Sequence, residues 1–372
     1  MTTLTTGNRF FFMLLIGSMV AFTPSEPGIF SPDYIKGRML TVVDWQLKNP
    51  KHKTTNWTNG AMYAGIFAAY ETTKSPVVLD SLMAMGERTN WQPGARYDHA
   101  DDIAICQTYI NLYRLKKDRR MIQPTIDTVQ KMSRVPGREV ANHGIRWWWC
   151  DALFMAPPVL CQLGNTLNQP AYFALNDSLY RQTYDLLYNK EQHLFARDAN
   201  YLINAAGEGK KESNGQKIFW SRGNGWVIGG LALLLQELPK NHPSRNGYIT
   251  LFKQMSERLR GLQQTDGLWR SSLLDPAAFP GGEGSGSGFD CYALAWGINQ
   301  GILDKKTYLS AVQKAWTGLN TLVSPEGRVG WVQPIGADPR KNFSADSWEV
   351  YGAGAYLLAG SEVIKIRELS KS

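Results

Sequence analysis

Apolar positions recur every three or four residues along most of the chain after an N-terminal leader, and this spacing predicts amphipathic α-helices. Glycine, proline and Asn-Gly pairs interrupt the pattern and mark the connections between helices. The predicted helices, about twelve in number, cover residues 33–48, 58–73, 77–88, 101–115, 120–133, 151–164, 169–188, 223–237, 245–263, 287–300, 305–321 and 348–367. Strand-like alternation is confined to short connections at residues 194–202, 217–220 and 328–334.

An even number of helices, with longer Gly- and Trp-rich junctions between alternate pairs, indicates an all-α fold of six helical hairpins closed into an (α/α)6 barrel. No linker or break in composition divides the chain, so we expect one domain over residues 28–370. An open α-solenoid has the same helix count, although internal repeats of fixed period are not visible. Residues suited to chemistry fall at alternate junctions, and a barrel would gather those loops at one end.

The first residues have the pattern of a secretory signal peptide. Arg9 provides a positive charge, and the apolar run from Phe10 to Phe22 is too short to span a bilayer comfortably. We therefore predict a signal peptide over residues 1–22, export to the periplasm or the medium, and no stable membrane insertion.

Composition argues against several classes of partner. The formal net charge is +8, but the basic residues are dispersed rather than aligned in a stripe, which argues against nucleic-acid binding. The five histidines are scattered without the spacing of metal ligands, so we expect neither a metal nor a cofactor. The four cysteines show no paired spacing that predicts a disulfide, and the sequence leaves the oligomeric state open.

The segment from Arg146 to Pro158 places one carboxylate, Asp151, directly behind three indoles, Trp147 to Trp149. Aromatic surface solvates a carboxylate poorly, which raises its pKa toward values useful to a general acid. Trp faces are also common platforms for sugar rings. A buried aromatic cluster in which Asp151 caps a helix explains the same residues without function, and both interpretations stay open at this point.

Two further clusters are candidates for chemistry. Asp98, Asp101 and Asp102 lie with His99 just before a predicted helix, and three carboxylates exceed what helix capping requires. Asp101 or Asp102 opposite Asp151 would make the carboxylate pair that glycoside chemistry uses.

The second cluster runs from Trp220 to Trp226. Its glycines permit close approach of a ligand, and Arg222 offers a planar fork for a carboxylate, although an arginine on the solvent face of a helix explains the segment equally well. The glycine-rich run at residues 281–288 lacks the lysine of a phosphate-binding loop.

Six motifs together carry a resemblance to a known family. The motifs are Trp57-Thr-Asn-Gly60, His99-Ala-Asp-Asp-Ile103, Trp147 to Met155, Ser221 to Trp226, Glu283 to Ser287 and Tyr351 to Ser361. In this order they resemble the unsaturated rhamnogalacturonyl hydrolases of glycoside hydrolase family 105, which are related to the unsaturated glucuronyl hydrolases of family 88.

The resemblance implies an (α/α)6 barrel that removes a 4,5-unsaturated glucuronyl or galacturonyl residue from the non-reducing end of oligosaccharides produced by polysaccharide lyases. The parent polysaccharide would be of the pectin, rhamnogalacturonan or arabinogalactan type. Asp151 matches the catalytic acid/base, which would protonate C4 of the double bond so that water adds at C5. Asp101, with an uncertainty of one residue, matches the second carboxylate.

The resemblance also implies which residues contact the substrate. Arg222 and Trp226 match substrate-contacting residues, with Arg222 expected to be free to pair the uronate carboxylate and Trp226 and Trp57 to stack on sugar. The full set of expected substrate-binding residues is Arg222, Trp226, Asp102, His99, Trp57, Trp149 and Asn224. Many family members carry a histidine in the segment equivalent to residues 194–201, where this chain reads Leu-Phe-Ala-Arg-Asp-Ala-Asn-Tyr, so the exact sugar stays open.

Two other functions fit the same residues. One is a conventional inverting glycosidase that uses Asp151 with Asp101 or Asp102 as acid and base. The other is a sugar-binding protein without catalytic activity.

Overall fold

A computed structural model describes residues 1–2, 28–135, 144–366 and 369, and these residues are predominantly helical. The α-helices are α1 (Pro32–Lys48), α2 (Trp57–Thr73), α3 (Pro76–Arg88), α4 (Ala100–Ile103), α5 (Cys106–Lys116), α6 (Gln123–Arg134), α7 (Ala152–Met155), α8 (Pro157–Leu167), α9 (Pro170–Leu187), α10 (Ser221–Glu237), α11 (Arg245–Leu262), α12 (Gly284–Asn299), α13 (Lys305–Thr321) and α14 (Val350–Val363). Short 3-10 helices cover Arg119–Met121, Ala199–Tyr201 and Pro276–Ala278. Strands β1 (Tyr188–Asn189) and β2 (Leu194–Phe195) form an antiparallel pair.

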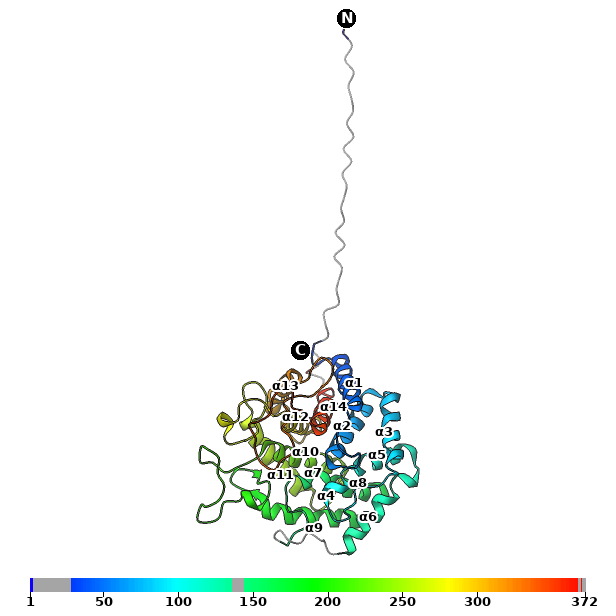
Figure 1. Cartoon of the computed structure of the whole chain (residues 1–372), viewed down its shortest axis with the longest axis vertical. Helices are drawn as coiled ribbons and strands as arrows, with labels where there is room; N and C mark the ends of the chain where they lie inside the picture. The colour runs from blue at the N-terminus through cyan, green and yellow to red at the C-terminus, as the bar shows by residue number, and fades with distance from the viewer. Residues whose placement is uncertain (3–27, 136–143, 367–368, 370–372) are drawn as a thin grey trace.

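The helices form two concentric rings. α2, α5, α8, α10, α12 and α14 each contact the next, and α14 packs against α2 to close the inner ring. Figure 1 shows α1, α3, α6, α9, α11 and α13 around this ring, with the C-terminal α14 beside the N-terminal α1 and α2. The architecture confirms the predicted (α/α)6 barrel.

The two rings differ in the distribution of apolar residues. On the inner helix α12 every residue from Gly284 to Ile298 is buried, whereas the outer helix α13 buries only one face. A helix that is apolar on all sides belongs in a core, and one with a single apolar stripe belongs at its edge. Glycine permits the closest contact in the inner ring, because a Cβ on Gly65 of α2 would overlap the carbonyl oxygen of Gly354 of α14.

The structure differs from the predicted elements in two places that matter for the site. The helix predicted over residues 151–164 is divided into α7 and α8, because Pro157 and Pro158 cannot donate the backbone hydrogen bonds that would continue α7. The helix predicted over residues 101–115 is likewise divided into α4 and α5. Two of the inner helices, α5 and α8, are therefore each preceded by one short turn of helix, and these two turns, α4 and α7, contact each other.

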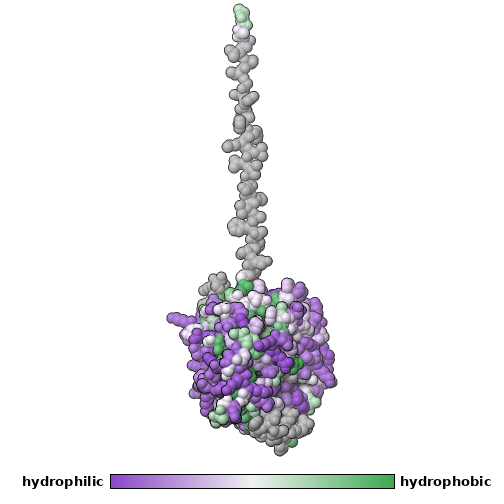
Figure 2. All heavy atoms as spheres, turned by 60° about the vertical axis from the view of Figure 1, so that its left-hand side comes forward, coloured by the Kyte–Doolittle hydropathy of each residue, from purple (hydrophilic) through white to green (hydrophobic). Residues whose placement is uncertain are grey.

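The surface and the termini complete the description. On the face drawn in Figure 2, the described residues are mostly hydrophilic. No helix among the described residues has the length and apolar character needed to cross a membrane. The predicted signal peptide over residues 1–22 lies, apart from Met1 and Thr2, outside the described part of the chain and stays a prediction.

Candidate active site

The N-terminal ends of the inner helices meet at one end of the barrel. Trp57, at the start of α2, contacts Trp226 of α10 and stacks on Tyr351 of α14, with ring centroids 5.5 Å apart and an interplanar angle of 11°. Helix N-termini carry unpaired N–H groups and partial positive charge. This end of the barrel therefore favours an anionic ligand.

Asp151 lies at this end, immediately before α7, and only 7% of its surface is exposed. Its side chain makes no capping hydrogen bond to α7, so helix capping does not explain its presence. Trp147 and Trp149 are buried around it, and the Cys150 thiol donates a 3.3 Å hydrogen bond to Oδ1. Burial raises the pKa of Asp151, while the positive charges of Arg197 and Arg222 act in the opposite direction.

Asp101 is the electrostatic neighbour of Asp151. Burial and the negative charge of Asp151 raise the pKa of Asp101 to about 7, against the lowering effect of Arg96 and Arg197. The backbone N–H of Asp101 donates a 3.3 Å hydrogen bond to Nδ1 of His99, which lies 3.7 Å from the Asp101 carboxylate. The structure thus brings together two carboxyls with raised pKa values, Asp151 with 7% exposure and Asp101 with a side chain that is 16% exposed.

Asp102, the alternative second carboxylate, is occupied elsewhere. Its oxygens accept hydrogen bonds from the backbone N–H of Arg96 at 2.7 Å, from Nε at 3.1 Å and from Nη2 at 2.6 Å. The ion pair closes the loop before α4. The charge of Asp151 acts on Asp101, whereas the Asp102 carboxylate is paired with Arg96 within the loop. The roles of Asp101 as the second carboxylate and of Asp102 in substrate binding stay predictions.

The structure also corrects the expectation that Arg222 is free to bind a carboxylate. Its side chain is fully buried, and its terminal nitrogens donate to the carbonyl oxygens of Gln333 at 2.5 Å and Pro334 at 2.9 Å. The guanidinium lies over the rings of Trp220 and Tyr351, 4.4 and 4.7 Å from their centroids. Arg222 therefore holds the 333–334 segment against α10 and acts on Asp151 only through its charge.

Trp226 is part of the core rather than of an open surface. It has no exposed area and is enclosed by Trp57, Phe154, Phe289 and Tyr351, with ring centroids 4.4 to 6.0 Å away. An enclosed indole has no face to offer a sugar ring, so the expectation that Trp226 stacks on substrate is corrected. Trp57 is only partly buried, so the prediction that it stacks on a sugar ring stays open.

Asn224 likewise serves the framework. Its Oδ1 accepts a 2.8 Å hydrogen bond from the N–H of Phe195, and its Nδ2 donates 3.1 Å hydrogen bonds to the carbonyls of Phe195 and Trp220. These bonds fasten β2 to α10 and use the amide at both ends. The predicted contact between Asn224 and substrate is therefore not available in this arrangement.

Arg197, to which the sequence analysis gave no role, lies beside Asp151. The N–H of Cys150 donates a 2.8 Å hydrogen bond to the Arg197 carbonyl, and Trp149 forms an isolated bridge with Asp198. The Arg197 guanidinium donates from Nη1 to Asp198 at 2.6 Å and lies over the ring of Trp148. The signal for this residue was its position in the segment where related proteins carry a histidine.

His99 and Trp149 complete the surroundings of the carboxyl pair. Their ring centroids lie 4.6 Å apart, and both side chains are largely buried.

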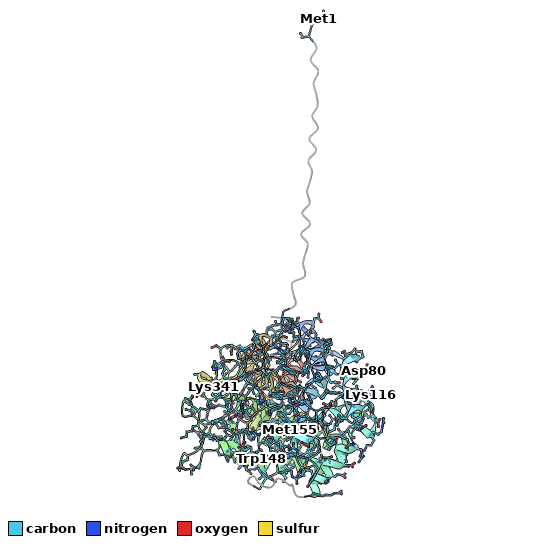
Figure 3. All side chains as sticks on the ribbon, in the orientation of Figure 1. Met1, Asp80, Lys116, Trp148, Met155 and Lys341 are labelled. Atoms are coloured by element: carbon cyan, nitrogen blue, oxygen red, sulfur yellow. The ribbon has the colours of Figure 1, made fainter. Side chains whose placement is uncertain are left out.

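Figure 3 shows Trp148 and Met155 within the ring of helices and Asp80 and Lys116 at its periphery. Within the described part of the chain, no group of three or more His, Cys, Asp or Glu side chains is arranged to hold a metal ion.

Comparisons with known proteins place the chain in a family. Glycosyl Hydrolase Family 88 matches residues 33–367. A relative from Formosa agariphila, named unsaturated 3S-rhamnoglycuronyl hydrolase, is 42% identical over 366 residues, which cover 95% of this chain and 97% of the relative.

Two solved structures are similar over most of the chain. One, named Polysaccharide Lyase, has 31% identity and a TM-score of 0.83 and covers 91% of this chain and 98% of its own. The other, named glycosyl hydrolase family 88 from Bacteroides vulgatus, has 28% identity and a TM-score of 0.83, with coverage of 90% and 99%. The chain is a glycoside hydrolase with an (α/α)6 barrel, and it belongs to glycosyl hydrolase family 88.

Proposed function

We propose that this enzyme removes a 4,5-unsaturated uronic acid from the non-reducing end of oligosaccharides released by a polysaccharide lyase. The observation that carries the proposal is the pair of carboxyls with raised pKa values, Asp101 and Asp151, at the barrel end where helix N-termini favour an anion. The name of the 42% identical relative supports a glucuronyl group linked to a 3-sulfated rhamnose as the preferred substrate.

The proposed reaction is hydration of a vinyl ether. Protonated Asp151 gives its proton to C4 of the C4=C5 bond, and positive charge develops at C5 and the ring oxygen. Water adds to C5 and returns a proton to the Asp151 carboxylate. The resulting hemiketal opens to a ketone at C5 and leaves a hemiacetal at C1. This hemiacetal breaks its C1–O bond to the neighbouring sugar, which leaves as an alcohol while C1 becomes an aldehyde. A buried acid with a raised pKa suits the first step, because the proton must be present near the working pH.

The remaining residues around the pair have positioning roles in this proposal. Asp101 holds the attacking water or a ring hydroxyl, and His99 hydrogen-bonds the start of α4 on which Asp101 lies. Trp149, packed on His99, excludes water from the carboxyls, and Trp57 offers an apolar edge for a sugar ring.

The test follows the ultraviolet absorbance of the conjugated alkene in unsaturated disaccharides made by lyases. Hydration should remove the absorbance as the second sugar is released, most rapidly with the 3-sulfated rhamnose substrate. Asp151→Asn should lower kcat by about 10²- to 10⁴-fold, as loss of a general acid does. Asp80→Asn, on the exposed outer helix α3, is the matched control and should leave kcat unchanged.

Other outcomes identify other functions. A rise in absorbance on an intact polysaccharide would mean lyase activity, as the name of one similar structure suggests for that protein. Cleavage of saturated chains with anomeric inversion would mean a conventional glycosidase. No absorbance loss with any pectic, sulfated or glycosaminoglycan-derived unsaturated product would contradict the proposal.

We also propose that the protein is exported, because Arg9 and the apolar run to Phe22 have the pattern of a secretory signal. N-terminal sequencing of protein recovered from the periplasm or medium should find a start near residue 22. Recovery of an intact N-terminus only from the cytoplasm would contradict export.

A further inference from the structure

Two cations influence Asp151, and they differ in exposure. Arg222 is fully buried and gives both terminal nitrogens to main-chain carbonyls. Arg197 is 20% exposed and uses Nη1 for Asp198, and its Nε, like that of Arg222, is buried without a hydrogen-bond partner. An unpaired buried N–H is costly, and a bound anion is the natural group to satisfy it.

Backbone geometry fixes Arg197 at the site. The segment after β2 pairs with the segment before α7, through the Trp149–Asp198 bridge and the hydrogen bond from Cys150 N–H to the Arg197 carbonyl. Arg197 therefore lies across from Cys150, the neighbour of Asp151. Its side chain keeps 20% exposure, so a solute can reach the guanidinium.

The substrate carries its charge close to the reacting carbon. In a 4,5-unsaturated uronic acid, the carboxylate is attached to C5, which is bonded directly to C4. An acid that reaches C4 therefore lies near the carboxylate as well. A cation beside that acid, with a planar fork of donors, is the group that the carboxylate meets.

We propose that Arg197 binds the carboxylate of the terminal uronyl group, and that this pairing shifts the proton of the carboxyl pair from Asp101 to Asp151. The proposal rests on the function proposed above. One O–H bond breaks at Asp101 and one forms at Asp151, and no other bond changes in this step.

The physical reason is competition for the Arg197 charge. In the free enzyme, Arg197 stabilises the charged form of Asp151, and burial with the Asp151 charge raises the pKa of Asp101 to about 7. In this proposal the free enzyme keeps the proton on Asp101, the carboxyl on which the charge of Asp151 acts. A substrate carboxylate neutralises Arg197, so the charged form of Asp151 loses its main partner and takes the proton that C4 requires.

The other groups around the pair do not provide this exchange. Besides Arg197, the titratable and charged side chains that interact with Asp151 or Asp101 are Cys150, Asp102, Arg96, Arg222, Tyr351 and His99, while Asp198 pairs with Arg197. Arg96 is held by Asp102, and Arg222 is held by the main chain. Arg197 remains as the partly exposed cation that acts on Asp151.

Binding tests the first half of the proposal. Calorimetry compares the unsaturated disaccharide with its uronate methyl ester on Asp151→Asn and on the double variant with Arg197→Gln. The single variant should bind the acid about 10- to 100-fold more tightly than the ester, the range of a charge-assisted hydrogen bond. The double variant should bind both alike. An unchanged preference in the double variant would overturn the assignment.

Two variants guard against misinterpretation. Arg197→Lys in the Asp151→Asn background keeps the charge without the fork and should retain part of the preference for the acid. Arg181→Gln in the same background removes an exposed arginine that pairs with Asp185 on the outer helix α9, and the full preference should remain. Loss of the preference in Arg181→Gln as well would overturn a specific role for Arg197.

Infrared difference spectroscopy tests the second half. A saturated uronyl disaccharide, which lacks the double bond, is added to the unmodified enzyme. The carboxylic C=O band that is absent from Asp101→Asn should disappear, and the band that is absent from Asp151→Asn should appear. No exchange of bands would overturn the proton shift. Turnover of the unsaturated disaccharide by the unmodified enzyme tests the proposed function separately, so failure of one is distinguishable from failure of the other.

Discussion

Asp290 provides the sharpest test of the electrostatics of the barrel wall. The residue lies on α12 without exposure, and neither carboxyl oxygen has a hydrogen-bond partner. Burial, with a smaller contribution from the charge of Glu283, raises the pKa of Asp290 well above its ordinary value. The folded protein therefore keeps a proton that the unfolded chain releases above about pH 4.

This difference makes the protein less stable as pH rises. Between the unfolded pKa of about 3.9 and pH 7, the free energy of unfolding should fall by about 1.4 kcal/mol per pH unit, or up to about 4 kcal/mol. Asp290→Asn keeps the shape and removes the titration. The buried amide lacks partners as the neutral carboxyl does, so the cost of burying each polar group is similar.

Urea unfolding followed by Trp fluorescence at pH 4.5, 6 and 7.5 measures the effect. Asp290→Asn should exceed the unmodified protein by about 1 kcal/mol or less at pH 4.5 and by up to about 5 kcal/mol at pH 7.5. Asp80→Asn, which changes an exposed aspartate on α3, is the control and should show no such gain. An Asp290→Asn protein that is less stable at pH 7.5, or a gain independent of pH, would refute the reasoning.

Three further predictions address the site and its support. In the pH profile of kcat/KM, activity should fall at high pH with an apparent pKa near 7, because the carboxyl pair must hold a proton and the pKa of Asp101 is about 7. Asp101→Asn should move this fall in activity to lower pH. An unmoved profile would exclude Asp101 as the residue that stores the proton. Trp226→Ala should destabilise the protein by about 3–5 kcal/mol in urea unfolding, because it empties a fully buried site, whereas weaker binding at unchanged stability would place the indole in contact with sugar. Gly65→Ala should destabilise the protein by about 1–3 kcal/mol, because the added Cβ overlaps Gly354. Gly37→Ala is the control and should stabilise the protein slightly, because its Cβ meets no atom within 4 Å. Equal melting temperatures for the two variants would contradict the close contact between α2 and α14.

Helical periodicity was sufficient to predict the fold because most helices carry their own start and stop signals. The helix predicted over residues 305–321 matches α13 at both ends, where Asp304 caps the first turn by accepting a hydrogen bond from the Thr307 N–H. The helix predicted over 151–164 was divided, although Pro157-Pro158 was a visible signal for a break. Local chemistry therefore set the element boundaries, and the periodic pattern set the number of hairpins.

The residues around the site were harder to assign, because a motif does not separate the surface of a cleft from the wall behind it. Arg222, Asn224 and Trp226 lie within the first two turns of one inner helix, α10, and are all fully buried. Each binds another part of the barrel: Arg222 the 333–334 segment, Asn224 the β2 strand, and Trp226 the aromatic core. The sequence indicates that these residues form one motif. Whether a guanidinium or an amide already has its hydrogen-bond partners depends on main-chain groups elsewhere in the fold, and these cannot be read from a motif.

The same reasoning explains why Arg197 matters more to the site than the motif residues around it. The buried residues of α10 fix the position of β2, and β2 carries the segment that sets Arg197 beside Asp151. This framework thus presents Arg197 to the carboxyl pair as a partly exposed cation whose Nε has no hydrogen-bond partner. Because Arg197 stabilises the charged form of Asp151, the acid is weakest as a proton carrier when the site is empty. In the proposed mechanism, the carboxylate of the substrate neutralises Arg197 and so raises the pKa of Asp151. The carboxylate by which the enzyme recognises its substrate therefore also promotes protonation of the catalytic acid.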